Sequence, residues 1–134
     1  MKRLFIISLL FLSVGLSQKL YEVIETYENG NIESITYHKK IRDSIGKVKK
    51  EGYYENGQKS EEVTYKDGKK DGLFTSWYEN GQKSGEGTHK DGERYGLGTE
   101  WYKNGQMKSE GTWKDGEQIS GYEWDEDGSV IMFY

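Results

Sequence analysis

Two stretches of the sequence repeat one another in turn residues, glycines and aromatic residues. Residues 68–82 read GKKDGLFTSWYENGQ, and residues 92–106 read GERYGLGTEWYKNGQ. Their Asn-Gly pairs, at 80–81 and 104–105, lie 24 residues apart. A fixed period in this range is the mark of a repeat architecture.

The same period extends outward in both directions. Asn-Gly pairs stand at 56–57, 80–81 and 104–105, Asp-Gly pairs at 67–68, 91–92 and 115–116, an earlier Asn-Gly pair at 29–30 and a later Asp-Gly pair at 127–128. Such pairs between alternating polar and apolar runs indicate β-hairpins, because both central residues of a type I′ turn need positive φ. The sequence therefore predicts an all-β fold, an elongated antiparallel meander of repeated β-hairpins with about ten short strands.

Alternation along the strands predicts what the sheet buries. Leu73 and Trp77 lie on the same face of their strand, because side chains alternate with period two. Glycine inside a strand often marks a place where an aromatic ring lies over the gap. We therefore expect Trp77, Trp101 and their neighbouring tyrosines to lie across strand glycines such as Gly87 and Gly111, as an aromatic ladder.

The first 17 residues have the features of a signal peptide. A positive start at residues 1–3 is followed by an apolar run over 4–12 and by the small residues Gly15 and Ser17. We expect cleavage after Ser17, which leaves residues 18–134 as the repeat domain of an exported, periplasmic or extracellular protein. The apolar run is shorter than the roughly 20 residues that cross a bilayer. An uncleaved anchor and a buried first strand are the alternatives.

Three segments of the remaining chain depart from the repeat. Residues 20–24 and 130–134 are its most apolar pieces and are predicted to form the first and last strands. Residues 37–50 break the period and are rich in lysine, so we expect a loop, a bulge or a displaced hairpin there.

Composition excludes several classes of function. The chain has no cysteine, which excludes disulfides, zinc–thiolate sites and a lipid-anchored amino terminus. Its net charge of -4 argues against nucleic acid as a partner. The two histidines, the acids Glu62, Glu86 and Glu110 one period apart, and a partial calcium-loop pattern at 123–128 are interpreted as structural. We predict no enzyme activity, no catalytic residue, no metal and no cofactor.

The repeats resemble a known family. The two quoted stretches, and the segment 53–57 that reads YYENG, are similar to MORN repeats and most of all to the bacterial MORN variant form. The resemblance covers about residues 27–128. It implies an array of β-hairpins that serves in interaction. Bacterial members are often described as antitoxin-like, and eukaryotic arrays have been linked to membrane lipids.

Three hypotheses of function remain. The first is an exported, non-enzymatic module that binds a partner protein through one sheet face or an edge strand. The second is a module that binds cell-wall glycan, or peptidoglycan, through exposed aromatic rings. The third is an antitoxin-like neutraliser with a cytosolic partner. The candidate partner-binding residues are Trp77, Tyr78, Trp101, Tyr102, Trp113 and Trp124. A core role for the tryptophans is the alternative, since the sheet has few aliphatic residues.

Overall fold

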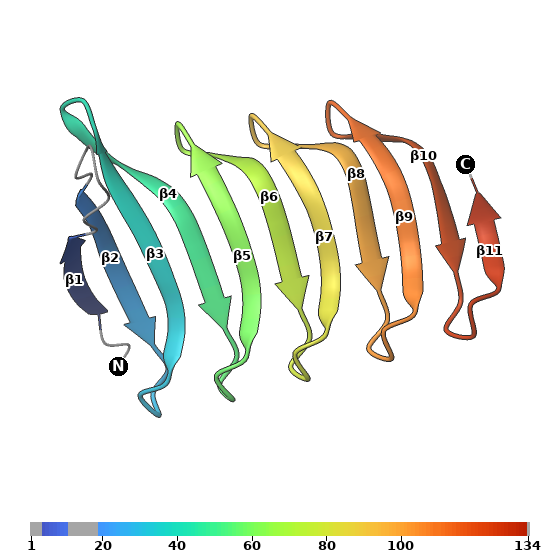
Figure 1. Cartoon of the computed structure of the whole chain (residues 1–134), viewed down its shortest axis with the longest axis horizontal. Helices are drawn as coiled ribbons and strands as arrows, with labels where there is room; N and C mark the ends of the chain where they lie inside the picture. Colours follow the sequence, from blue (N-terminus) through green and yellow to red (C-terminus); the bar gives the residue numbers. More distant parts are fainter. Residues whose placement is uncertain (1–3, 11–18, 134) are drawn as a thin grey trace.

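A computed structural model describes residues 4–10 and 19–133 as one open antiparallel sheet (Figure 1). The sheet has 11 strands that follow one another in chain order, and the described residues contain no helix. This confirms the predicted all-β meander. The strands are β1 (Leu4–Leu10), β2 (Lys19–Thr26), β3 (Ile32–Ile41), β4 (Ser44–Tyr53), β5 (Lys59–Lys66), β6 (Lys69–Trp77), β7 (Lys83–Lys90), β8 (Glu93–Trp101), β9 (Met107–Lys114), β10 (Glu117–Trp124) and β11 (Val130–Phe133).

The turns at the two ends of the sheet differ in geometry. In the Asp-Gly turns at 67–68, 91–92 and 115–116 both residues have positive φ, for example 49° at Asp67 and 80° at Gly68, as a type I′ turn requires. In the Asn-Gly turns only the glycine has positive φ, 83° at Gly57. Its N–H donates to Tyr54 O at 2.9 Å, which makes a type I turn that ends in a left-handed glycine. The prediction of type I′ turns is therefore right for these three Asp-Gly pairs and wrong for the Asn-Gly pairs and for the Asp-Gly pair at 127–128, where only Gly128 has positive φ.

Side chains at the Asn-Gly end tie each hairpin to the next. The Tyr78 hydroxyl donates to Trp101 O at 2.7 Å, and the Tyr102 hydroxyl donates to Trp124 O at 2.9 Å. Tyr54 makes the same bond to Trp77 O. Asparagine amides make a second such series, with Asn80 Nδ2 donating to Lys103 O. Stability of the array therefore depends on contacts between neighbouring repeats.

Removal of one of these hydroxyls is expected to weaken the array. Tyr78→Phe leaves the Trp101 carbonyl without its donor, so we expect the free energy of unfolding to fall by about 1 kcal/mol. Urea titration followed by circular dichroism measures this change. Tyr95→Phe is the matched control, because its ring is 46% exposed and its hydroxyl makes no hydrogen bond to any described residue. Equal losses in the two variants would contradict the tyrosine series.

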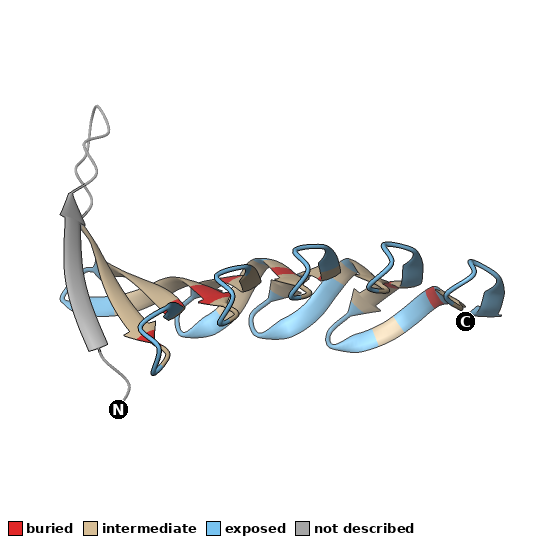
Figure 2. Cartoon of the chain, turned by 90° about the horizontal axis from the view of Figure 1, so that it is seen from below, coloured by how far each residue is buried: buried red, intermediate tan, exposed pale blue. Residues whose placement is uncertain are grey.

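The sheet is a single layer with almost no interior. Figure 2 shows it from below, with exposed residues along both of its sides. Among the described residues Val63 alone is a buried hydrophobic side chain, 2% exposed. Within strands β2 to β10 most side chains are half-buried by their neighbours on the same face, whereas those of the turns are mostly exposed. Cross-strand packing on each face therefore replaces a core between layers.

The expected ladder of tryptophans over glycines is wrong for Trp77 and Trp101. Trp77 pairs with Lys83, and Trp101 pairs with Met107, whereas Gly87 pairs with Phe74 on the opposite face of the sheet. Ring cover of a glycine does occur elsewhere. Trp113 Nε1 lies 3.3 Å from the position that a Cβ on Gly98 would take.

The segments outside the regular repeats form hairpins as well. Residues 37–50 belong to the β3–β4 hairpin, which has a bulge at Tyr37/His38, and its turn places Arg42 at a φ of 54°. The predicted terminal strands correspond to β2 and β11, and β1 precedes β2. In the intact chain Leu4 pairs with Glu25. Residues 1–3 and 11–18 lie outside the described residues, so cleavage of the signal peptide stays a prediction.

Candidate functional site

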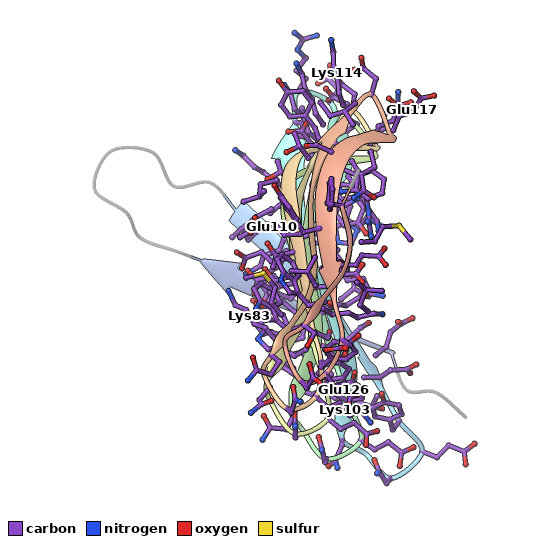
Figure 3. All side chains as sticks on the ribbon, turned by 90° about the vertical axis from the view of Figure 1, so that its right-hand side faces the viewer. Lys83, Lys103, Glu110, Lys114, Glu117 and Glu126 are labelled. Atoms are coloured by element: carbon purple, nitrogen blue, oxygen red, sulfur yellow. The ribbon has the colours of Figure 1, made fainter. Side chains whose placement is uncertain are left out.

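The two faces of the sheet carry different side chains. The glycine face bears the row Val63, Phe74, Gly87, Gly98, Gly111 and Gly121, which are paired from strand to strand. The threonine face bears the row Glu62, Thr75, Glu86, Thr99 and Glu110, paired in the same way. Figure 3, a view along the sheet, shows Lys83 and Glu110 on the same side of the ribbon. The two faces are therefore considered separately.

A groove of about 330 Å³ lies on the glycine face over β6 to β10. The groove begins where large side chains in one hairpin are replaced by glycines in the next. In the first regular hairpin the cross-strand pair is Val63 with Phe74, whereas one period later the pair is Gly87 with Gly98. The glycine pair leaves backbone as the floor of the groove, open at Gly87 and bordered by the Trp113 ring at Gly98.

Aromatic rings stand on both sides of this floor. The Phe74 and His89 rings meet edge to face with their centroids 5.9 Å apart. On the far side, the Arg94 guanidinium lies 4.7 Å from the centre of the Trp113 ring. Burial of His89, with the charges of Lys70 and Arg94 nearby, lowers the pKa of its imidazole. The groove is therefore bordered by rings and one fixed cation, with His89 biased toward its neutral form.

Polar groups complete the groove. Ser84 Oγ donates to Ser76 Oγ at 2.9 Å, and an Arg94 nitrogen lies 3.9 Å from the Glu100 carboxylate. Gln118 covers part of the floor, since its amide occupies the space that a Cβ on Gly111 would take. Donors and acceptors of hydrogen bonds thus line the groove together.

The threonine face combines ion pairs with exposed apolar side chains. Lys59 and Lys49 pair with Glu62, and Lys83 pairs with Glu86. These lysine partners and the intervening threonines support the interpretation of the period-spaced acids as strand-face residues. The apolar side chains that stand free on this face are Leu73, Tyr95, Leu97 and Ile119, each 46–59% exposed.

The six sequence-predicted binding residues do not form one site. All six are half-buried. Tyr78 and Tyr102 use their hydroxyls to join hairpins, as described above. Trp77 and Trp101 lie beneath the Lys59 and Lys83 ammonium groups on the threonine face, at 5.7 and 6.0 Å from the ring centres.

The two remaining tryptophans lie in different parts of the sheet. Trp113 lines the groove on the glycine face. Trp124 packs against the Tyr122 ring near β11. The exposed Leu73 and Leu97 were missed by the sequence analysis, although their 24-residue spacing was a signal that could have found them.

The other residues considered as metal ligands or catalytic groups have structural roles or lie away from the groove. Asp125 Oδ1 accepts hydrogen bonds from the Asp127 and Ser129 N–H groups, so the partial calcium-loop pattern caps its own turn. His38, on β3, lies away from the groove, and its Nδ1 is buried without a partner among the described residues. Within residues 4–10 and 19–133 no group of His, Asp or Glu side chains could hold a metal ion.

Comparison with known proteins identifies the repeats. Three consecutive stretches, residues 47–67, 70–91 and 94–115, match the family model described as MORN repeat variant. No curated protein and no solved structure matches the chain. MORN repeats are generally modules for interaction with proteins or membranes and are typically non-catalytic. The part of the chain that the structure describes holds no helix of the length and hydrophobicity needed to cross a membrane.

Proposed function

The chain belongs to the MORN repeat variant family, and we propose that it is an exported, non-enzymatic module that binds a partner protein at the cell envelope. The observation that carries this proposal is the apolar row of the threonine face. Leu73 on β6 is 53% exposed, and Leu97 on β8 is 58% exposed, although the sheet has no second layer to cover them.

The exposed apolar side chains form a continuous surface rather than isolated sites. Leu73 and Tyr95 both pair with Thr88, and Leu97 pairs with Thr112 on the next strand. Ile119 continues the series on β10 and is 59% exposed. Apolar and aromatic side chains in the middle of a patch, with charged residues around it, are the usual anchors of protein interfaces. A partner that lies across the repeats would supply the missing layer.

Loss of two leucines from this row is expected to weaken partner binding strongly. We expect Leu73→Ser with Leu97→Ser to weaken binding by 100-fold or more, because central apolar anchors each contribute about 2 kcal/mol. The measurement is crosslinked capture from native envelopes followed by mass spectrometry. Both leucines are exposed, so the double variant is expected to fold.

The control for this capture experiment removes an exposed aliphatic side chain that lies far from the apolar row. Ile45→Ser removes an equally exposed side chain, 61% exposed, from the distant β3–β4 turn. We expect it to retain the partner. Capture of the same partner by the double variant would overturn the proposed use of the threonine face.

Export is proposed from the signal-like residues 1–17. The protein from its natural source is then expected to begin at Gln18. An intact Met1 and a cytosolic location would instead favour the antitoxin-like hypothesis, because that function requires a cytosolic partner.

A further inference from the structure

We propose that the groove on the glycine face binds a neutral sugar ring of a wall or surface polysaccharide. This site is separate from the protein-binding row, which lies on the opposite face of the sheet. It also differs from the sequence-based hypothesis of glycan binding, since only Trp113 of the six predicted residues lines the groove.

The open floor is not required by the fold. A Cβ on Gly87 would lie 3.6 Å from Gly98 Cα and 3.8 Å from Leu97 O, which are ordinary contacts. The backbone at Gly87 is not left-handed, and the same position one period earlier holds Val63. Glycine weakens a strand, and in a strand it often marks a site where a ligand approaches the backbone closely. Gly87 therefore leaves open a space that a valine side chain fills at the equivalent position of the preceding repeat.

One donor is placed beside this floor without a partner. The Trp113 indole N–H makes no hydrogen bond to any described residue, and its nitrogen lies 3.3 Å from where a Gly98 Cβ would be. The nitrogen is not among the fully buried atoms that lack a hydrogen-bond partner in the described residues, so a ligand can reach it. A hydroxyl group of a ligand on the glycine floor would supply the acceptor.

The charges in the groove select the class of ligand. Arg94 offers only donors, Glu100 offers only acceptors, and Ser84 offers both. An anionic ligand would meet the carboxylates of Glu100 and Glu123, and a purely apolar ligand would bring no hydrogen-bonding group to Arg94, Glu100 or Ser84. A neutral polyhydroxylated ring can donate and accept at every position. Its apolar edge can also contact the Phe74 ring.

The dimensions agree with a small ligand. The strands that carry Phe74 and Trp113 are three strand spacings apart, or about 14 Å, with β7 and β8 as the floor between them. A volume of about 330 Å³ lies at the lower end of small-molecule sites. The groove thus suits a short segment of a linear saccharide rather than a folded partner.

The test is titration of the full protein with cellotetraose, maltotetraose and chitotetraose, followed by tryptophan fluorescence and calorimetry. We expect at least one of these sugars to bind. Gly87→Val should weaken that binding at least tenfold by filling the floor with the side chain that Val63 already has. Trp113→Phe should weaken it about tenfold, because the ring remains and the N–H donor is lost.

Two controls separate the possible outcomes. Leu73→Ser, in the protein-binding row and outside the lining of the groove, should bind the sugar normally, so that failure of the groove and failure of the protein-binding row are distinguishable. If Gly87→Val does not fold, Trp113→Phe still tests the site. The proposal is overturned if no sugar binds, if both groove variants bind as well as the unaltered chain, or if inorganic phosphate binds there and the sugars do not.

Discussion

Replacing Glu51 by glutamine is expected to lower the free energy of unfolding by about 3 kcal/mol at pH 7. Glu51 is 8% exposed and lies on β4, where the irregular β3–β4 hairpin meets the regular repeats. Its Oε2 accepts hydrogen bonds from the Tyr37 hydroxyl at 2.9 Å and the Tyr53 hydroxyl at 3.0 Å. Its Oε1 lies 2.9 Å from Lys59 Nζ and 3.0 Å from Lys49 Nζ.

The size of this effect follows from the pKa of the carboxyl group. Burial by itself raises the pKa of Glu51, but hydrogen bonds from Lys59, Lys49 and the two tyrosines outweigh it and lower the pKa from 4.5 to about 2. A pKa that is lower in the folded state means that ionised Glu51 stabilises the fold. Glutamine keeps the shape and removes the charge, so that Lys49 and Lys59 then share the Glu62 carboxylate.

The low pKa of Glu51 also predicts that the free energy of unfolding falls at acid pH. Because the folded pKa is depressed, the contribution of Glu51 is complete above about pH 4.5 and is lost as the pH falls toward about 2. We expect urea titrations between pH 7 and pH 2.5 to show this loss in the unaltered chain. The Glu51→Gln variant should lack most of it.

Glu86→Gln is the matched control for this experiment. Glu86 lies on the same row of the threonine face, its side chain is 35% exposed, and its ion pair is with Lys83. Exposed pairs of this kind contribute about 0.2–1 kcal/mol. Similar losses from the two glutamine variants would show that the Glu51 cluster has no special role.

The sequence was sufficient for the architecture because turns are local. The Asp-Gly pair at 67–68 has positive φ at both residues, and the pairs at 91–92 and 115–116 reverse the chain in the same way. The 24-residue period then placed every regular hairpin in order. The left-handed Arg42 turn of the β3–β4 hairpin carries no such signal, so the sequence left a loop, a bulge or a hairpin open there.

The site was harder to predict because it depends on cross-strand register. Whether Trp101 or Trp113 borders the glycines is decided by which residues pair, and bulges such as the one at Gly87/Thr88 shift those pairs. The Glu51 cluster likewise joins side chains from three strands. A chain with one layer also leaves Leu97 exposed, whereas the usual rule would bury a leucine.

The second large effect is expected from Gly72→Ala, which should lower the free energy of unfolding by about 3 kcal/mol. Gly72 has a φ of 98°, in the left-handed region that costs alanine about 1–2 kcal/mol. An added Cβ would also lie 2.6 Å from Thr64 Oγ1. That hydroxyl is held in place by its hydrogen bond to Asp71 O, so the clash is not relieved by a simple rotation.

Gly96 separates the two causes, because it occupies the same position one period later. Its φ is 74°, and a Cβ there would meet nothing within 4 Å. Gly96→Ala should therefore cost only the backbone term, about 1 kcal/mol. Urea titration of both variants, and of Gly72→Ala combined with Thr64→Ala, measures the difference. The combined variant should recover most of the excess loss if the Thr64 hydroxyl causes it, whereas equal losses at Gly72 and Gly96 would mean that backbone conformation alone fixes these glycines.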